Sequence, residues 1–134
     1  MLRKAIEYTD YFGNNRKEDY YFHLNKAELL ELEMKTPGGL SEYIQRIADS
    51  QDGAAIIKTF KEIILMSYGE RTPDGKGFIK KAPDGHKLCD DFEQTEAFSE
   101  LFMELATDAE AATAFINGII PAVAKNNNVV PFNG

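Results

Sequence analysis

The feature that most constrains the fold is an amphipathic segment that spans residues 92–121. Its apolar side chains recur at steps of three and four residues, which places them on one face of a helix. Its acidic side chains fall on the opposite face. A segment with this pattern must bury its apolar face against other parts of the chain or against a partner.

Two capping patterns divide this segment. Asp91-x-x-Gln94 and Thr107-x-x-Glu110 each place a side-chain acceptor three residues before a glutamine or glutamate, which is typical of a helix start. They predict two helices, over about residues 91–106 and 108–118. Proline at position 121 ends the second, since proline cannot continue a helix.

The net charge is concentrated in this part of the chain. Residues 1–87 hold 14 basic and 14 acidic side chains, whereas residues 88–134 hold eight acidic ones and a single lysine, Lys125. The C-terminal third therefore supplies the whole formal charge of -7. Nucleic-acid-binding proteins cluster Lys and Arg, so this distribution argues against a nucleic-acid partner. A solvated helix face explains the acids.

The rest of the chain predicts a mainly α fold. Residues 4–9 and 20–24 are rich in β-forming side chains and predict an N-terminal antiparallel hairpin. Apolar periodicity then predicts three helices, which begin at Asn25, Leu40 and Gly53. Asn25-x-x-Glu28 has the form of a capping box for the first of them, and Asp52 is the expected cap of the third. Two Pro-Asp-Gly turns follow within residues 69–87. We therefore expect about five helices in one compact domain over residues 1–121, with the hairpin at about 4–24 and a flexible tail over 122–134.

Patterns for catalysis, metal binding and membrane insertion are absent from the sequence. The stretch from Gly69 to Gly77 has the wrong spacing for a phosphate loop and lacks its Ser or Thr. His86-x-x-Cys89 with its neighbouring aspartates provides too few nitrogen and sulfur ligands for a structural zinc site. The single cysteine fits a reducing compartment, and no apolar run has the length of a membrane span. We expect a cytosolic protein without enzymatic activity or cofactor.

The aromatic and aliphatic stripe leaves two interpretations open. These side chains form the core of the domain, or they present a groove for a partner helix. The residues that would contact a partner on the second interpretation are Phe92, Phe98, Leu101, Phe102, Leu105, Phe115 and Ile116.

Three segments carry a family resemblance. Residues 66–80, 92–108 and 112–121 resemble the tail assembly chaperones of long-tailed bacteriophages, in particular siphovirus-type phages of Gram-positive hosts. The Tyr8-x-Asp10-x-Phe12-Gly13 region and the helix at Asn25 resemble them less closely. The matching residues lie along predicted helices and do not include a pattern of catalytic residues. The resemblance therefore implies a role and no active site.

The resemblance implies a non-enzymatic factor of virion morphogenesis, and the charge and helical periodicity predict that it is acidic and all-α. Such a protein binds the tape measure protein in the host cytoplasm and keeps it soluble until tail tube subunits polymerise around it. It is missing from the mature virion, and this chain would be the short form of a frameshifted pair. The tail tube protein is a second partner to consider, and an exposed hairpin edge allows self-association. Two alternatives are a virion structural adaptor, such as a connector or tube-end protein, and an acidic inhibitor of a host protein.

Overall fold

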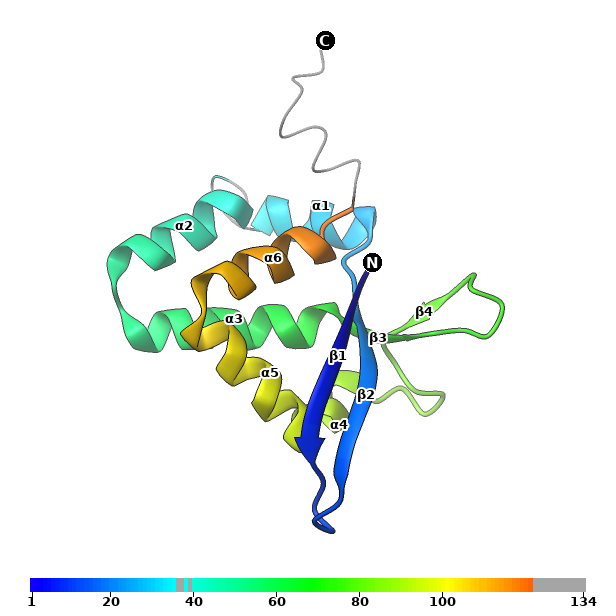
Figure 1. Cartoon of the computed structure of the whole chain (residues 1–134). Coiled ribbons are helices and arrows are strands. Elements are labelled where there is room, and N and C mark those ends of the chain that lie inside the picture. The colour runs from blue at the N-terminus through cyan, green and yellow to red at the C-terminus, as the bar shows by residue number, and fades with distance from the viewer. Residues whose placement is uncertain (36–37, 39, 122–134) are drawn as a thin grey trace.

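The computed structural model describes residues 1–35, 38 and 40–121. Within these residues the chain forms six helices and a four-stranded antiparallel sheet with the strand order β1-β2-β3-β4. The helices gather on one side of the β1–β2 hairpin, and β3 and β4 extend from its other side as an arm (Figure 1). The elements are β1 (Leu2–Thr9), β2 (Asn15–Phe22), α1 (Lys26–Lys35), α2 (Leu40–Ser50), α3 (Gly53–Ser67), β3 (Tyr68–Arg71), β4 (Phe78–Ile79), α4 (Leu88–Glu93), α5 (Glu96–Thr107) and α6 (Ala109–Ile119).

The expectation of a mainly α, all-α fold is wrong. The predicted hairpin is present, but β3 and β4 extend it into a sheet, so the fold is mixed α/β. These two strands are only four and two residues long, too short to show an alternating pattern. Gly69 makes their pairing possible, because a Cβ atom there would lie 2.6 Å from the Phe78 ring.

Side-chain caps set the starts of several helices. Asn25 and Glu28 form the predicted reciprocal capping box at α1: the amide of Glu28 donates to Asn25 Oδ1 at 2.8 Å, and the amide of Asn25 donates to Glu28 Oε1 at 2.9 Å. Asp52 accepts a hydrogen bond from the amide of Ala55 at the start of α3. Both caps could be predicted from the sequence, because each depends on two residues three positions apart in the chain.

The two helices predicted for the C-terminal segment have different boundaries in the structure. The first is split, because Thr95 caps α5 by accepting from the amide of Phe98 and donates its own hydroxyl to the carbonyl of Phe92 at the end of α4. The second begins after Asp108, whose carboxylate accepts from two amides of α6. Thr107, the predicted cap, instead donates to the carbonyl of Met103 and ends α5.

The core lies between the helices and one face of the sheet. Phe22 at the end of β2 is fully buried at its centre, with its ring 5.2 Å from that of Phe115 and 5.8 Å from those of Tyr68 and Phe92. Burial alternates along β1, and Ile6 is its buried residue. The predicted tail, residues 122–134, lies outside the described residues. Among the helices that are described, none is both long and apolar enough to cross a membrane.

Lys80, which follows β4, connects α1, α3 and the segment after β2, and this gives a prediction for stability. Its ammonium group donates to the carbonyls of His23 and Met66 at 2.8 and 2.9 Å and to the Glu28 carboxylate at 2.8 Å. Since a hydrogen bond to a charged group contributes about 1.5–3 kcal/mol, Lys80→Met should lower the free energy of unfolding in urea by about 2 kcal/mol. Lys81→Met, at the exposed neighbouring position, is the matched control. Equal effects of the two substitutions would contradict the role of Lys80.

Candidate interaction surface

Most of the residues predicted to contact a partner lie inside the protein. Phe92, Phe98, Leu101, Leu105 and Phe115 belong to the buried core. Phe102 and Ile116 pack against that core and remain partly exposed. Of these seven side chains, therefore, Phe102 and Ile116 are the two with substantial solvent exposure in the folded chain.

Among the described residues, the most exposed aromatic side chains lie at the tip of the β1–β2 hairpin. Phe12 is 93% exposed and Tyr11 is 74% exposed. The tip projects beyond the helices at the lower end of the molecule (Figure 1). Exposed aromatic residues of this kind are enriched among the residues that dominate protein–protein binding.

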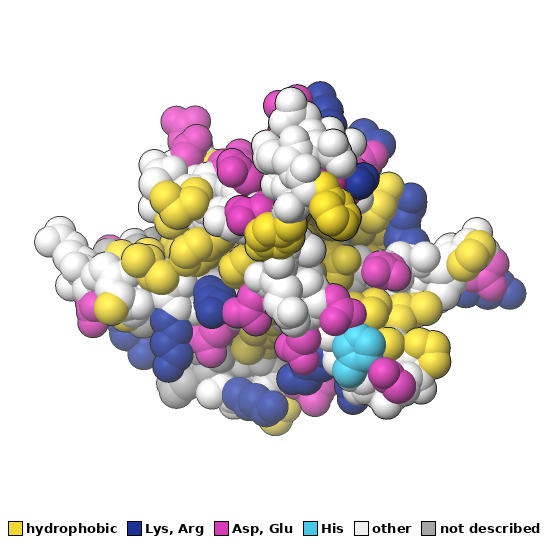
Figure 2. Space-filling view, turned by 90° about the horizontal axis from the view of Figure 1, so that it is seen from below, with side chains coloured by type: hydrophobic (Ala, Val, Ile, Leu, Met, Phe, Trp, Pro, Cys, Tyr) yellow, Lys and Arg dark blue, Asp and Glu magenta, His cyan; other side chains and the backbone are white. Residues whose placement is uncertain are grey.

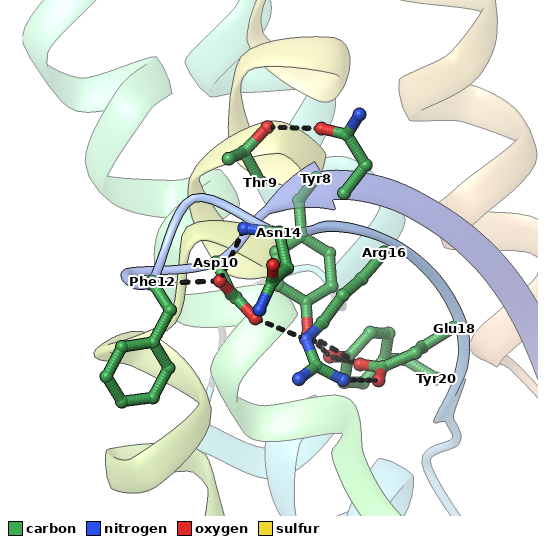
Figure 3. Close-up of polar contacts among 9 residues, drawn as sticks. Tyr8, Thr9, Asp10, Phe12, Asn14, Arg16, Glu18 and Tyr20 are labelled. Carbon is green, nitrogen blue, oxygen red and sulfur yellow. Dashed lines mark hydrogen bonds and ion pairs between the residues drawn. The ribbon is translucent and has the colours of Figure 1, made fainter.

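Asp10 holds the tip in one conformation. Its Oδ1 atom accepts hydrogen bonds from the amides of Phe12 and Asn14, both at 2.9 Å, and its Oδ2 atom pairs with Arg16 at 2.6 Å (Figure 3). Backbone hydrogen bonds from Asp10 to Asn14 and from Gly13 to Asp10 close the turn. Gly13 has a φ of +85°, which favours glycine. The exposure of Phe12 thus belongs to an ordered turn.

A polar cluster behind the turn fixes it to the sheet. Glu18 accepts hydrogen bonds from the hydroxyls of Tyr8 and Tyr20 and also pairs with Arg16 (Figure 3). The Tyr8 hydroxyl, more than any other group, lowers the pKa of Glu18, so this carboxylate stays charged. Burial raises the pKa of the Tyr20 phenol, which stays neutral and able to donate.

Tyr11 connects the tip to the helices. Its hydroxyl donates to the carbonyl of Gln94, between α4 and α5, at 3.2 Å. Desolvation and then the nearby charge of Glu96 raise the pKa of the Tyr11 phenol. The hairpin tip is therefore adjacent to the N-terminal end of α5.

The side of α5 next to the hairpin carries acidic residues at every fourth position. Glu104 pairs with Lys4 of β1 at 3.1 Å, and Glu100 lines a hollow that Tyr8 and Arg16 also line. Met103, 55% exposed, lies on the outer side of the same helix. Figure 2 views the side to which the tip points and shows acidic side chains beside hydrophobic ones at its centre. We define the α5–tip surface as Tyr11, Phe12, Glu96, Glu100, Met103 and Glu104.

Helix α1 exposes a separate pair of apolar side chains. Leu30 and Met34 are four residues apart, on one face of the helix, and both are exposed. Leu29 attaches the same helix to the core. This pair lies away from the ordered hairpin turn and therefore serves as an internal comparison for the α5–tip surface.

The sequence pattern did not identify Tyr11 and Phe12 as surface residues. Both lie in the segment that was expected to form the hairpin turn, and apolar periodicity gives no information on turns. One signal was present: Phe12 immediately precedes Gly13-Asn14, and an aromatic residue at the tip of a tight turn is far from the core.

The histidine and cysteine considered for metal binding lie just before α4 and in its first turn. Among the described residues, no three or more His, Cys, Asp and Glu side chains are grouped so as to hold a metal ion. Cys89 is partly buried, which raises the pKa of its thiol. His86 bridges Asp84 and Asp91, at 2.5 and 2.7 Å, and so links the second Pro-Asp-Gly turn to α4.

This bridge predicts a pH dependence. The hydrogen bond that His86 donates to Asp91, followed by the one it donates to Asp84, raises the pKa of His86 from 6.5 to about 8. Because the folded pKa is the higher one, the stabilisation is fully present below pH 6.5 and is lost as the pH rises through about 8. In an NMR titration we expect a His86 midpoint near pH 8, which Asp91→Asn lowers and Asp90→Asn leaves in place. A midpoint near 6.5 in the unmodified protein would exclude the bridge.

The fold and its exposed residues define the class of protein: a small, acidic α/β domain with two exposed aromatic residues on an ordered hairpin turn. A family model described as phage tail assembly chaperone matches residues 1–129. Since the match covers nearly the whole chain of 134 residues, the protein belongs to this family. No curated protein and no solved structure gave a match.

Family membership confirms part of what the resemblance implied. It supports a role in phage tail assembly that is exercised through protein partners.

Proposed function

We propose that this protein binds the tape measure protein of a long-tailed phage with a Gram-positive host. It acts in the host cytoplasm, keeps this client soluble until tail tube subunits polymerise around it, and is then released. The family supports the role in tail assembly. The client, the release step and absence from the finished virion are the proposed parts.

The observation that carries the proposal is the exposure of Phe12 on an ordered turn. The hydrogen bonds of Asp10 already order the backbone that carries this ring, so the turn loses little conformational entropy on binding. An aromatic ring next to acidic side chains can hold an apolar client while the charges keep the complex soluble. Tube subunits must displace the chaperone, so a small surface with moderate affinity suits the role.

Co-expression tests this function. The tape measure protein encoded by the same phage is expressed alone and together with this chain, and its soluble fraction and co-purification are measured. We expect both to rise in the presence of the chain. No change in either would exclude the proposal. Mass spectrometry of purified particles separates a chaperone, which is missing from them, from a structural adaptor, which is retained.

A further inference from the structure

We infer that the α5–tip surface binds a basic amphipathic helix of the client. The apolar stripe of this helix contacts Phe12 and Met103, and a row of Lys or Arg side chains lies along Glu96, Glu100 and Glu104. This inference rests on the proposed function, because it specifies the chemistry of the client segment at the same surface.

The charges around the tip favour a basic partner. Each nearby cation is already neutralised: Lys4 pairs with Glu104, Arg16 with Asp10 and Glu18, and Lys17 with Glu7. Within the described residues, Glu96 and Glu100 form no ion pair. The surface therefore offers two carboxylates without a counter-charge and disfavours an acidic partner.

The spacing of the acids favours a helix. Glu96, Glu100 and Glu104 follow one another at four-residue steps, so they form a row about 12 Å long on one side of α5. Basic residues at four-residue steps on a second helix have the same spacing and can pair with this row along its length. An extended strand, in which side chains on one face repeat about every 7 Å, matches it less well.

The apolar positions suit the same helix. The hairpin tip, which carries Phe12, lies next to the N-terminal end of α5, because Tyr11 contacts Gln94 there. Met103 lies two helical turns further along α5. Ser99 between them is small and exposed, which allows a second helix to approach closely. Methionine adapts its side chain to different neighbours, so the surface can accept more than one segment of a long client.

The test uses the full chain and overlapping peptides that tile the tape measure protein. Affinity is measured for the unmodified protein, for the double variant Glu96→Gln/Glu100→Gln, and for the control Glu31→Gln/Glu110→Gln, which makes the same change in net charge at exposed positions elsewhere. We expect the tightest peptides to be basic and helical, the first variant to bind them about fivefold more weakly and the control to bind within about twofold. Raising the salt from about 0.1 M to about 1 M should weaken binding.

Three results would overturn the inference while leaving the proposed function in place. The first is that the peptides that bind most tightly are neutral or acidic. The second is that the two double variants weaken binding equally, and the third is that the affinity does not change with salt. Failure of every peptide to bind would instead count against the proposed function. A peptide-free protein that runs as a dimer, and as a monomer after Phe12→Ser, would show that a second copy occupies the surface, and would also overturn the inference.

Discussion

Replacing Phe12 with serine should weaken binding of the tape measure protein by about 30-fold, corresponding to about 2 kcal/mol at a binding hot spot. The same change should shift the free energy of unfolding by no more than about 0.5 kcal/mol, since the ring is 93% exposed and contributes little to the core. Calorimetric titration with a soluble client fragment measures the first effect, and unfolding in urea measures the second.

The matched control is Met34→Ser on α1. Met34 is 80% exposed, so this variant also removes an exposed apolar side chain, but from the separate pair on α1. We expect it to bind the client normally. If Met34→Ser weakens binding and Phe12→Ser does not, the client binds at α1, and the assignment of the α5–tip surface is wrong.

A second control separates the ring from the turn that presents it. Gly13 has a φ of +85° and open space around it, so Gly13→Ala strains the backbone without a steric clash. This variant keeps Phe12 but loosens its position. An intermediate loss of affinity would indicate that the order of the turn, as well as the aromatic ring, contributes to binding.

The sequence predicted those parts of the fold that depend on local chemistry. The capping box of Asn25 and Glu28, the cap of Asp52 and the helical periodicity after Phe92 all involve residues a few positions apart, and the structure contains each of them. The hairpin was also predictable, since both of its strands are rich in β-forming residues. Such features can be predicted without knowing which distant segments of the chain pack against them.

The parts that were missed depend on contacts between distant segments. Strand β3 exists because Tyr68 and Gly69 pair with Phe22 and Tyr21, some 50 positions earlier in the chain. The same limit applies to the predicted binding residues. Periodicity shows that Phe98 and Leu101 share an apolar face, but it does not show whether the rest of the chain or a partner covers that face.

An experiment can decide whether the chain itself or a partner covers this face. Because the structure places Phe98 in the core, replacing it with aspartate should unfold the domain. Phe98 is 8% exposed, and its ring packs 5.8 Å from that of Phe92 in an edge-on contact. The substitution removes this packing and places a carboxylate in an apolar site without a partner, at a cost of more than about 4 kcal/mol. A loss of this size approaches the whole stability of a domain at the lower end of the ordinary range of about 5–15 kcal/mol.

The same substitution one turn later provides the contrast. Phe102 stacks on Phe98 with 5.8 Å between ring centroids, yet it is only partly buried, so the new carboxylate of Phe102→Asp can reach water. We expect this variant to stay folded and to lose about 1–2 kcal/mol of stability. Circular dichroism and unfolding in urea distinguish the two variants. If Phe98→Asp is as stable as Phe102→Asp, the side chain of Phe98 is not part of the core, and its role as a contact for the client is open again.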